Sequence, residues 1–561
     1  MIWRTIFAIY YFIKYLPLRL WRHRGPMEHR GFVGVQIDGL SHHDLAYAAE
    51  RGYLPGLRRR LRNRECKLSR FPAGLPSATS YAQVGMFYGE NADIPAFRWY
   101  ERADRRVVNC NRPHSAEYIR PRLGNRMGIL RGGSSYVNLV DGDADRAVLT
   151  ANSSVPRSFF QEIGGIRLFL LALFHPLRML MTVLATVREI FFELYDRHTA
   201  PGRHSSVVEG WFPIIRALSN VVFREVQTIA VMADVYAGVP YIFTTFTSYD
   251  ELAHHYGPRS RPALKNLRGI FGRIFEIEKI ARRLPGRHYD LIVVSDHGQT
   301  PGQPFLRLYG ATLGQALHRH FEGRRVREET ERQDLPSTQT RGLYADHLQR
   351  RAAGLWFFPR SVLRAIATVL RRITNAESYL VEKYYVDPDN DFVVTYSGTL
   401  AHVYFSRSAE RLDDSAVRRE FPDVLAFLVN HPGIGLVASK APEGGLVLRS
   451  RRGVGILKDG EVRVVEGENP LAPYDDAGPV GRRALERMGG FANAGDLILF
   501  GDYGPERGFV CFDDQVASHG ALGGAQFWPF ILLPNDPRFA RLTLTDPRDL
   551  YAQVFLPYHS H

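Results

Sequence analysis

Cysteine is scarce in this sequence: 561 residues include three, Cys66, Cys110 and Cys511. Their number is odd and no two lie close together, which argues against a disulfide scaffold and against a cysteine-ligated metal. This usage is typical of a reducing compartment. Zinc-finger, helix-turn-helix and aromatic RNA-binding signatures are also missing, so nucleic acid is not expected as a structural partner.

The sequence also lacks an uninterrupted run of about 20 apolar residues, the length that a membrane-spanning helix needs. The N-terminal "MIWRTIFAIYYFIKYLPLRLWRHRGPMEHR" is interrupted by Lys14 and has no small-residue cleavage site, so it fits a secretory signal poorly. Its aromatic and apolar residues, bordered by Arg and Lys, predict a membrane-interface helix over residues 1–30. If this segment spanned a membrane, the arginines after it would leave the rest of the protein in the cytoplasm.

Positive charge is in excess, since 72 Lys and Arg face 58 Asp and Glu, a formal net charge of +14. An Arg-rich coding bias explains this as well as an anionic membrane surface or an anionic substrate does. Two further stretches, 166–196 and 355–373, are apolar but carry recurring arginines. Pro176 divides the first into two amphipathic helices, which either pack on the domain's own core or contact a membrane. Three such stretches predict association with a membrane surface, on its cytoplasmic face.

Strand-like and helix-like runs alternate along much of the chain. Residues 31–38, 241–248 and 289–295 read as buried strands, and 42–63 and 261–284 as helices. This alternation predicts an α/β fold with a doubly wound, mainly parallel sheet and with helical and α+β insertions.

The length predicts one large domain with insertions, or two to three domains. We expect a core over 31–324 that carries an apolar helical insertion at 160–200. A cap over 325–485 follows, and the core resumes over 486–561 with "GDLILFGD" and "FWPFILLP".

Acids and histidines collect where the predicted strands end, and one more histidine stands in the Gly-flanked loop "ASHGALGG". In an open parallel sheet the carboxyl ends of the strands meet at one edge, where such folds bind ligands. Carboxylates and imidazoles are ligands that suit zinc or manganese. The candidate ligands are Asp38, Asp250, His254, Asp296, His297 and His519.

The segment "PSATS" precedes a predicted helix and offers three hydroxyls, those of Ser77, Thr79 and Ser80. A hydroxyl held at a helix start beside divalent ions becomes a nucleophile, and the helix N-terminus favours an anionic substrate. The residues alone leave open which of the three attacks.

The order Asp38, "PSATS", "YDELAHHYGP", "VVSDHGQT" and "SHGALGG" resembles the alkaline phosphatase superfamily, in particular its type I phosphodiesterase/nucleotide pyrophosphatase branch. The match covers about a third of the chain. The resemblance implies an alkaline phosphatase-like core and two divalent ions, zinc or alternatively manganese. It implies that Asp38, Asp296 and His297 hold one ion, and that Asp250, His254 and His519 hold the other. Thr79 aligns with the nucleophile, which bridges toward the first ion and forms a covalent phospho-enzyme.

The chain departs from nucleotide pyrophosphatases after the nucleophile helix, where no Asn stands at the equivalent spacing. Asn91 and Arg98 are the nearest candidates to contact the substrate phosphate. His402, in the expected cap, is a further candidate for substrate contact, whereas His42, His43 and His255 are expected to be structural. The C/S-x-P-x-R motif of sulfatases is absent.

The expected function is therefore that of a metal-dependent phosphoric ester hydrolase of the phosphodiesterase type, associated with a membrane surface and acting on a phosphate ester, a lipid-linked one included. A phosphomonoesterase or a phosphoryl-group transferase is the alternative within the superfamily. A membrane-bound interaction protein that has lost catalysis is the alternative of another class.

Overall fold

The computed structural model of the chain describes residues 27, 29–112, 114–148, 150, 176–199, 218–282, 287–329 and 384–560. The basic apolar stretch at 355–373 lies outside these residues, and so does the predicted interface helix at 1–30 except for residues 27, 29 and 30. The described part of the insertion at 160–200 is one helix, α8, Pro176–Thr199. Among the described residues, no helix combines the length and the apolar character that crossing a membrane requires.

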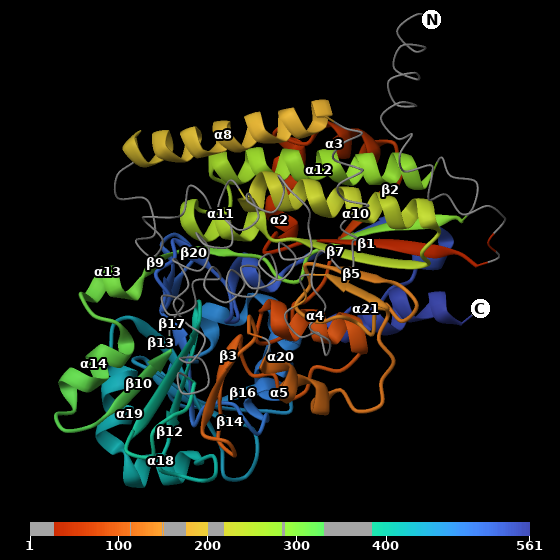
Figure 1. Cartoon of the computed structure of the whole chain (residues 1–561). Coiled ribbons are helices and arrows are strands. Elements are labelled where there is room, and N and C mark those ends of the chain that lie inside the picture. The colour runs from red at the N-terminus through yellow and green to blue at the C-terminus, as the bar shows by residue number, and fades with distance from the viewer. Residues whose placement is uncertain are drawn as a thin grey trace, which may run out of the picture.

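The core is a seven-stranded sheet in the order β2-β21-β8-β1-β7-β5-β6 (Figure 1). Strands β8, β1, β7, β5 and β6 run parallel to one another, whereas β21 is antiparallel to both of its neighbours. The predicted α/β class with a mainly parallel sheet is therefore confirmed. The strands are β1 Gly31–Ile37, β2 Cys66–Arg70, β5 Ser134–Tyr136, β6 Arg146–Val148, β7 Tyr241–Phe246, β8 Tyr289–Val294 and β21 Phe530–Pro534.

Strand β1 lies at the centre of the sheet and is buried along its whole length. Val33, Val35 and Ile37 pack into the apolar layer on one face, and Phe32 packs into the layer on the other. A strand that is covered on both faces has no solvent side, which is why its sequence is apolar nearly throughout.

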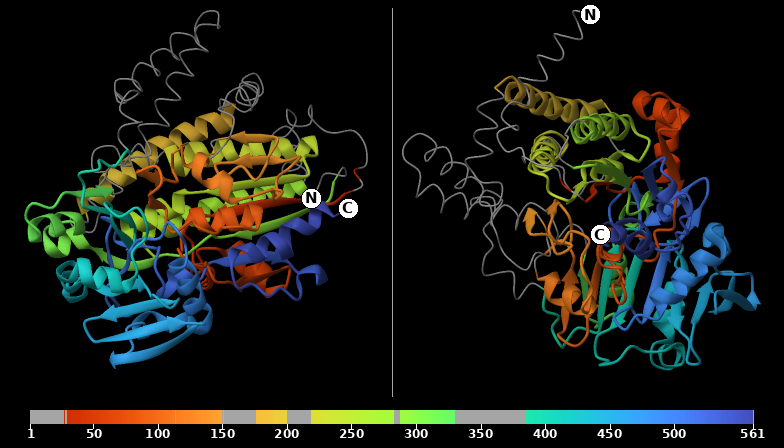
Figure 2. Two further views of the ribbon diagram at one scale, coloured as in Figure 1. Left: turned by 90° about the horizontal axis from the view of Figure 1, so that it is seen from below. Right: turned by 90° about the vertical axis from the view of Figure 1, so that its right-hand side faces the viewer.

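Helices cover both faces of this sheet (Figures 1 and 2). The layer on one face is formed by α2 His42–Glu50, α3 Pro55–Arg62, α10 Arg224–Ala237, α11 Ser248–Tyr256 and α12 Arg261–Ala281. The layer on the other face is formed by α4 Thr79–Tyr88, α5 Ser115–Arg122 and α21 Pro547–Leu550. Helix α8 lies outside the first layer, as Figure 1 shows.

Residues 42–63 form two helices, α2 and α3, and not the single helix that the sequence predicts. Gly52 lies between them with φ of +83°, a left-handed conformation that favours glycine. Pro55 is the first residue of α3, where its missing N–H costs no helical hydrogen bond. The apolar periodicity continues across the break, which is why the sequence reads as one helix.

A second, eight-stranded sheet has the order β10-β11-β12-β17-β13-β14-β15-β16. Its strands are β10 Val326–Glu329, β11 Phe392–Ser397, β12 Leu400–Phe405, β13 Ile434–Lys440, β14 Leu446–Ser450, β15 Gly453–Lys458, β16 Glu461–Gly467 and β17 Leu497–Gly501. Helices α14 Leu313–His320, α18 Asp414–Glu420, α19 Pro422–Asn430 and α20 Gly478–Gly489 accompany it.

The sequence predicts that "GDLILFGD" belongs to the resumed core, but the structure places this segment, β17, in the second sheet. It pairs instead with β12 and β13 in the middle of the second sheet. The apolar run that suggested a core strand is explained equally well by this central position, because β17 is buried along its whole length.

The chain then returns to the first sheet through a small four-stranded sheet in the order β18-β19-β9-β20. Its strands are β9 Thr300–Pro304, β18 Tyr503–Gly504, β19 Gly508–Cys511 and β20 Ala517–Ser518. Strand β9 follows the Asp296-His297 pair, and β20 immediately precedes His519. Pairing of β20 with β9 therefore brings these two segments together, although more than two hundred positions separate them in sequence.

Candidate metal centre

The six candidate ligands lie at one edge of the central sheet. Strand β1 pairs with β7 on one side and β8 on the other, in registers that bring their carboxyl ends together. Asp38 follows β1, Asp250 and His254 lie on α11 just after β7, and the Asp296-His297 pair follows β8. The structure therefore brings together residues that are far apart in the sequence, as the parallel-sheet argument predicts.

Asp38, Asp296 and His297 form one group whose ligand atoms all lie within 4.8 Å of one another. His297 Nε2 is 3.3 Å from Asp296 Oδ2 and 3.7 Å from Asp38 Oδ1. All three residues are buried. This is the set that the resemblance assigns to the first ion.

A second group overlaps the first and comprises Asp250, His297 and His519. The His297 and His519 rings are stacked with their centres 3.6 Å apart, and the His254 ring centre is 5.2 Å from that of His519. His254 Nε2 lies 3.0 Å from Asp250 Oδ2. The three residues that the resemblance assigns to the second ion thus lie close together, and His297 belongs to both groups.

Each of the three histidines has its Nδ1 within hydrogen-bond distance of a backbone carbonyl. The partners are Ala517 O for His254, at 2.8 Å, Gly298 O for His297, at 3.0 Å, and Ser77 O for His519, at 2.8 Å. A carbonyl can only accept, so each Nδ1 carries a proton, and Nε2 is the ring nitrogen left to face the ligand groups. This arrangement is the usual support of a metal-ligating histidine.

The carboxylates of the site face histidines and one another. No Lys or Arg in the described ranges forms an ion pair with Asp38, Asp250 or Asp296, and Asp296 Oδ2 is buried without a hydrogen-bond partner. Burial, followed by the nearby Asp296 and Asp250 carboxylates, raises the pKa of Asp38 well above its usual range. Buried carboxylates need paired charges or a metal, so the donor set fits divalent cations.

Histidines adjust the charge of the second group. Burial favours a higher pKa for Asp250, but the neighbouring His254, His519 and His297 imidazoles outweigh burial and lower that pKa below its usual range. Burial and the adjacent His297 also lower the pKa of His519 well below its ordinary value. His519 is therefore neutral at physiological pH, which is the protonation state that a metal ligand requires.

Gly39 is a part of the site that sequence reasoning missed. Its backbone N–H donates to Asp296 Oδ1 at 3.3 Å, and its φ is +69°. A Cβ atom at this position would lie 2.0 Å from Asp250 Oδ1. Only glycine lets the Asp250 carboxylate approach the Asp38 turn this closely. The sequence feature that could have identified Gly39 is its position directly after an acid at the end of a strand.

The structure distinguishes the three hydroxyls of "PSATS". Thr79, the first residue of α4, has its Oγ1 3.2 Å from His297 Nε2 and 3.4 Å from Asp38 Oδ1. Ser77 and Ser80 are fully buried and donate to the backbone carbonyls of Ala521 and Ala96. Thr79 Oγ1 is therefore the hydroxyl of the three that lies against the ligand groups.

Ser77 instead holds two loops together. Its backbone N–H donates to Gly520 O, its hydroxyl accepts from Gly520 N, and its carbonyl accepts from His519 Nδ1. These bonds fix His519 next to the start of α4. On the other side of the site, the Gln299 amide donates to the backbone carbonyl of Asp250 at 3.1 Å and also to its carboxylate. Neither role has a signal in the sequence, because the partners are distant along the chain.

Arg98, the first candidate for substrate contact, is buried at the start of β3, Arg98–Glu101. Its Nη1 donates to Tyr396 O at 2.9 Å and lies 3.5 Å from Asp513 Oδ2. Asp513 in turn accepts from Gly398 N. The guanidinium thus joins the first half of the chain to the second sheet and to the segment that leads to His519.

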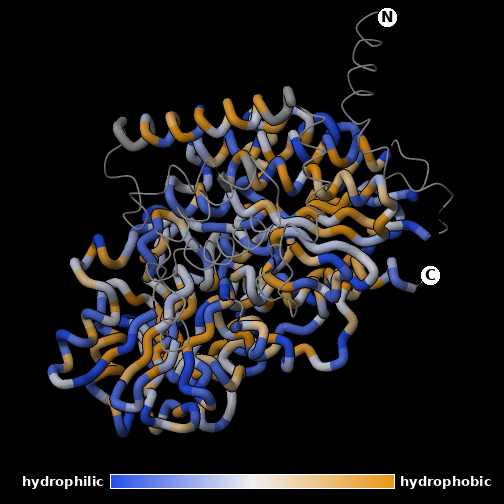
Figure 3. Tube along the Cα trace, viewed as in Figure 1, coloured by the Kyte–Doolittle hydropathy of each residue, from blue (hydrophilic) through white to orange (hydrophobic). Residues whose placement is uncertain are grey.

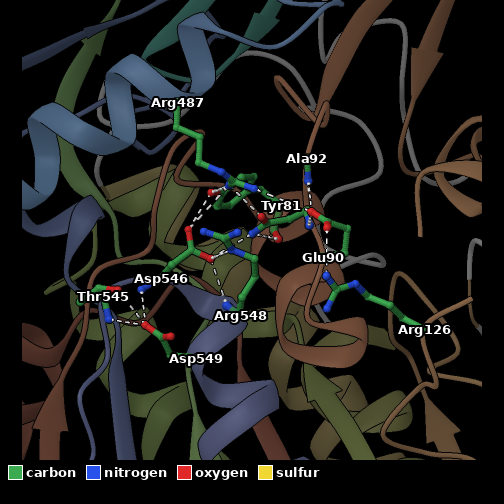
Figure 4. A network of polar contacts seen from close by, with 10 residues as sticks. Tyr81, Glu90, Ala92, Arg126, Arg487, Thr545, Asp546, Arg548 and Asp549 are labelled. Carbon is green, nitrogen blue, oxygen red and sulfur yellow. Dashed lines mark hydrogen bonds and ion pairs between the residues drawn. The ribbon is translucent and has the colours of Figure 1, made fainter. Parts of the chain in front are cut away.

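Asn91, the second candidate, belongs to a polar network with Tyr81, Arg487 and Asp546; Figure 4 shows these three partners close together. Asn91 is buried; its side-chain oxygen accepts from Arg487 at 2.8 Å, and its amide donates to Asp546 at 3.3 Å and to Tyr81 O at 3.4 Å. Tyr81 donates to Asp546 at 2.8 Å, and Arg487 reaches both of these groups. The side chain of Asn91 is thus engaged in connecting α4, α20 and the C-terminal segment.

Asn91→Ala is expected to destabilise the protein by about 1–3 kcal/mol, because Arg487 and Asp546 lose a buried partner. The KM for a phosphate diester should not change. Denaturant unfolding and steady-state kinetics on the same preparation check both statements. A raised KM with unchanged stability would restore Asn91 as a substrate contact.

His402 is structural, which corrects its prediction as a substrate contact. It is fully buried in β12; its Nε2 donates to Pro95 O at 3.0 Å, and its Nδ1 accepts from Gly495 N at 3.0 Å. Both ring nitrogens are therefore used. Burial lowers the pKa of His402 from 6.5 to about 4.

This depressed pKa predicts acid-dependent stability. Below about pH 6.5 the unfolded state binds a proton that the folded state does not, so stability falls as the pH falls toward 4, by roughly 3 kcal/mol in total. His402→Gln should make the slope of unfolding free energy against pH shallower in this window. Urea unfolding at a series of pH values measures both slopes, and parallel slopes would contradict the assignment.

His42, His43 and His255, which the sequence predicts to be structural, lie in neither ligand group of the described residues. His42 and His43 begin α2, and the His43 ring nitrogens lie 2.7 and 3.1 Å from Arg259 Nη2. His255 is buried with its ring against Tyr256.

Comparison with known proteins gives likeness in structure alone. No family model matches the chain, and no curated protein matches its sequence. Phosphonoacetate hydrolase from Sinorhizobium meliloti is similar at 14% identity and a TM-score of 0.41, over 96% of this chain and 97% of that one. The alkaline phosphatase PafA follows at 10% identity and a TM-score of 0.48, over 91% and 92%. Murine ectonucleotide pyrophosphatase/phosphodiesterase 5 is similar at 12% identity and a TM-score of 0.42, over 94% and 95%.

The resemblance to a known superfamily rests on the motifs and the site geometry of this chain. The mainly parallel sheet brings the sequence motifs to one edge. Thr79, the candidate nucleophile, lies there beside carboxylates and imidazoles. In motif order, mainly parallel sheet and site geometry, the chain resembles the alkaline phosphatase superfamily and, within it, the nucleotide pyrophosphatase-like branch.

Proposed function

We propose that this protein is a two-metal phosphohydrolase of the phosphodiesterase type that acts through a phospho-threonine at Thr79. One observation carries the proposal: Thr79 Oγ1 lies at the start of α4, 3.2 Å from His297 Nε2 and 3.4 Å from Asp38 Oδ1, within a buried group of acids and imidazoles. A hydroxyl needs such surroundings to act as a nucleophile.

The proposed ligands are Asp38, Asp296 and His297 for one ion and Asp250, His254 and His519 for the other. Divalent ions bound there, zinc or alternatively manganese, would supply Lewis acidity for the attacking and leaving oxygens of an in-line displacement. The protein contributes rigidity, because the three His Nδ1 atoms are tied to backbone carbonyls and Asp296 is tied to Gly39 N.

The residues then perform two successive displacements. Thr79 Oγ1 gives its proton to solvent and attacks phosphorus, the bond from phosphorus to the leaving oxygen breaks, and that oxygen takes up a proton. The phosphoryl group, which in a diester still carries its second alcohol, remains on Thr79. Water then attacks the same phosphorus and loses a proton, the bond to Oγ1 breaks, and Oγ1 regains its proton. The Ala78 side chain offers no cap to α4, so the first-turn N–H groups favour the negative phosphoryl oxygens.

The enzyme is further proposed to work at the cytoplasmic face of a membrane, on phosphate esters that include lipid-linked ones. Support comes from the excess of basic residues and from the three Arg-containing apolar stretches in the sequence. The finer choice among diester, monoester and phosphoryl transfer depends on product analysis.

The test is hydrolysis of bis-(p-nitrophenyl) phosphate against p-nitrophenyl phosphate by the full chain, with metal content by elemental analysis. Two bound ions and preferred diester turnover would support the proposal. Preference for the monoester, or transfer to an added alcohol, would favour the phosphomonoesterase or the transferase. A protein that binds no metal and turns over neither ester would refute the proposal and favour the interaction protein.

A further inference from the structure

Helix α8 exposes its apolar side and turns its polar side toward the protein. Helices on the surface of a soluble domain normally do the reverse. The only exposed charged residue between 180 and 195 is Arg188. Nine large apolar side chains of α8 are 36% to 67% exposed: Leu180, Met181, Val183, Leu184, Val187, Phe191, Phe192, Leu194 and Tyr195.

The inward side of α8 is tied to the protein by polar contacts, which hold the apolar side outward. Glu193 is fully buried and accepts from the Tyr256 hydroxyl at 2.5 Å, and Glu189 accepts from Asn220 at 3.0 Å. Rotating the helix to hide its apolar face would break these contacts. The outward direction of the apolar face is therefore a property of the fold.

Basic residues lie beside this apolar face. Arg261, Lys265 and Arg268 on α12, and Arg282 directly after it, are exposed. Lys265 Nζ lies 3.6 Å from the ring centre of Phe192 on α8. The acids of the same helix turn away from solvent, because Glu276 and Glu278 have side chains 10% and 7% exposed. The exposed stripe of α12 is thus positive.

Helix α3 extends the positive surface. Figures 1 and 2 show α8, α12 and α3 together in the outer layer on one side of the molecule. Arg58, Arg59 and Arg62 on α3 are exposed. Between α3 and α12 lies a cleft of about 390 Å³ lined by Arg59, Arg60, Lys279 and Arg282, of which Arg60 and Arg282 form ion pairs with Glu278, the one acid in its lining. This cleft suits an anionic phosphate head group.

An anionic lipid surface fits this face better than other occupants do. An apolar helix edged by basic residues is the pattern of helices that lie in a membrane interface. Two other apolar segments of this chain, 1–24 and 355–373, carry basic residues and no acid, so their charge would repel the basic edge. A second copy would bring the same positive charge against itself.

We propose that α8 is a docking helix that lies in the plane of an anionic lipid surface, with α12 and α3 supplying contacts to the lipid phosphates. The inference deepens the membrane association in the proposed function by naming the surface that makes it. Orange along α8 in Figure 3 marks the apolar part of this surface. Through the Glu193–Tyr256 bond, α8 is attached to α11, the helix that carries Asp250 and His254.

The experiment is co-sedimentation of the full chain with phosphatidylcholine vesicles, with and without phosphatidylserine, at low and high salt. Leu184→Glu and Phe191→Glu are each expected to weaken partition by about tenfold or more, because a charge replaces a side chain that enters the lipid. Arg58→Gln combined with Arg62→Gln should weaken binding to the anionic vesicles by on the order of tenfold and reduce its salt dependence. Val465→Glu is the matched control, since Val465 is 56% exposed on β16 in the second sheet.

The outcomes separate this inference from the proposed function. Turnover of the soluble diester should be unchanged in all of these variants, and vesicle binding remains measurable even if the wild type shows no turnover. Equal partition of wild type, Leu184→Glu and Val465→Glu would overturn the docking helix. The inference would also be overturned if the wild type did not bind vesicles and formed a dimer that Leu184→Glu dissociates. The apolar face of α8 would then be a contact between two copies of the chain.

Discussion

Thr79→Ala is expected to lower diester turnover by at least about a thousandfold while leaving bound metal and the melting temperature nearly unchanged. The methyl group cannot attack phosphorus, but the six ligand candidates and their backbone supports remain. Thr79 is the first residue of α4 and not its cap, so the helix loses no capping bond. Steady-state kinetics, elemental analysis and thermal unfolding measure the three quantities. Mass spectrometry of acid-quenched reactions should show one added phosphoryl group on wild type and none on the variant.

Ser80→Ala is the matched control for this variant. The Ser80 hydroxyl is buried one residue further on and donates to Ala96 O at 3.2 Å. Its removal should cost about 1 kcal/mol of stability and leave turnover largely intact. Thr79→Ser should retain part of the activity, because it keeps a hydroxyl. The opposite pattern, an inactive Ser80→Ala and an active Thr79→Ala, would remove Thr79 from the mechanism.

Asp296→Asn is expected to change the stability of the protein in opposite directions with and without metal. With ions present, the variant should lose one ion, turn over diester at least about a thousandfold more slowly and melt below wild type, because bound metal stabilises the folded state. After chelation the order should reverse. Asp296 lies beside the buried Asp38 carboxylate and raises its pKa, so a neutral amide at position 296 removes repulsion between two buried acids.

Thermal unfolding with and without chelator measures this reversal. Asp44→Asn provides the control: Asp44 is also buried, but it is paired with Arg259 at 2.7 Å. The Asp44→Asn variant should lose the same amount of stability with and without chelator, because the partner of Asp44 is a protein side chain. If chelation left the order of wild type and Asp296→Asn unchanged, the three carboxylates would not form a cation site.

The site shows which parts of the arrangement are local. A buried strand ending in Asp-His, and an acid four positions before a histidine on a helix, are visible in the sequence, and the parallel-sheet rule places them at one edge. The partners that orient these side chains are not visible. Ser77 O for His519 and Ala517 O for His254 are backbone atoms hundreds of positions away, and any residue type could supply them.

The contrast between Thr79 and its neighbours shows a second limit. "PSATS" presents three hydroxyls of similar chemistry, and their separation into one exposed to the ligand groups and two bound to carbonyls depends on the start of α4. Arg98 and Asn91 are likewise polar residues that read as phosphate contacts. Their partners, Asp513 and Asp546, come from the last tenth of the chain.

The sequence by itself determined the fold class, the set of metal-ligand candidates and the apolar character of α8, because each depends on residue type and short-range order. Only the tertiary structure decided that β17 belongs to the second sheet, that His402 is structural and that the apolar side of α8 faces outward. Strand partners and helix orientation depend on contacts between distant segments. An apolar or a polar pattern is compatible with several such partners, and packing selects one of them.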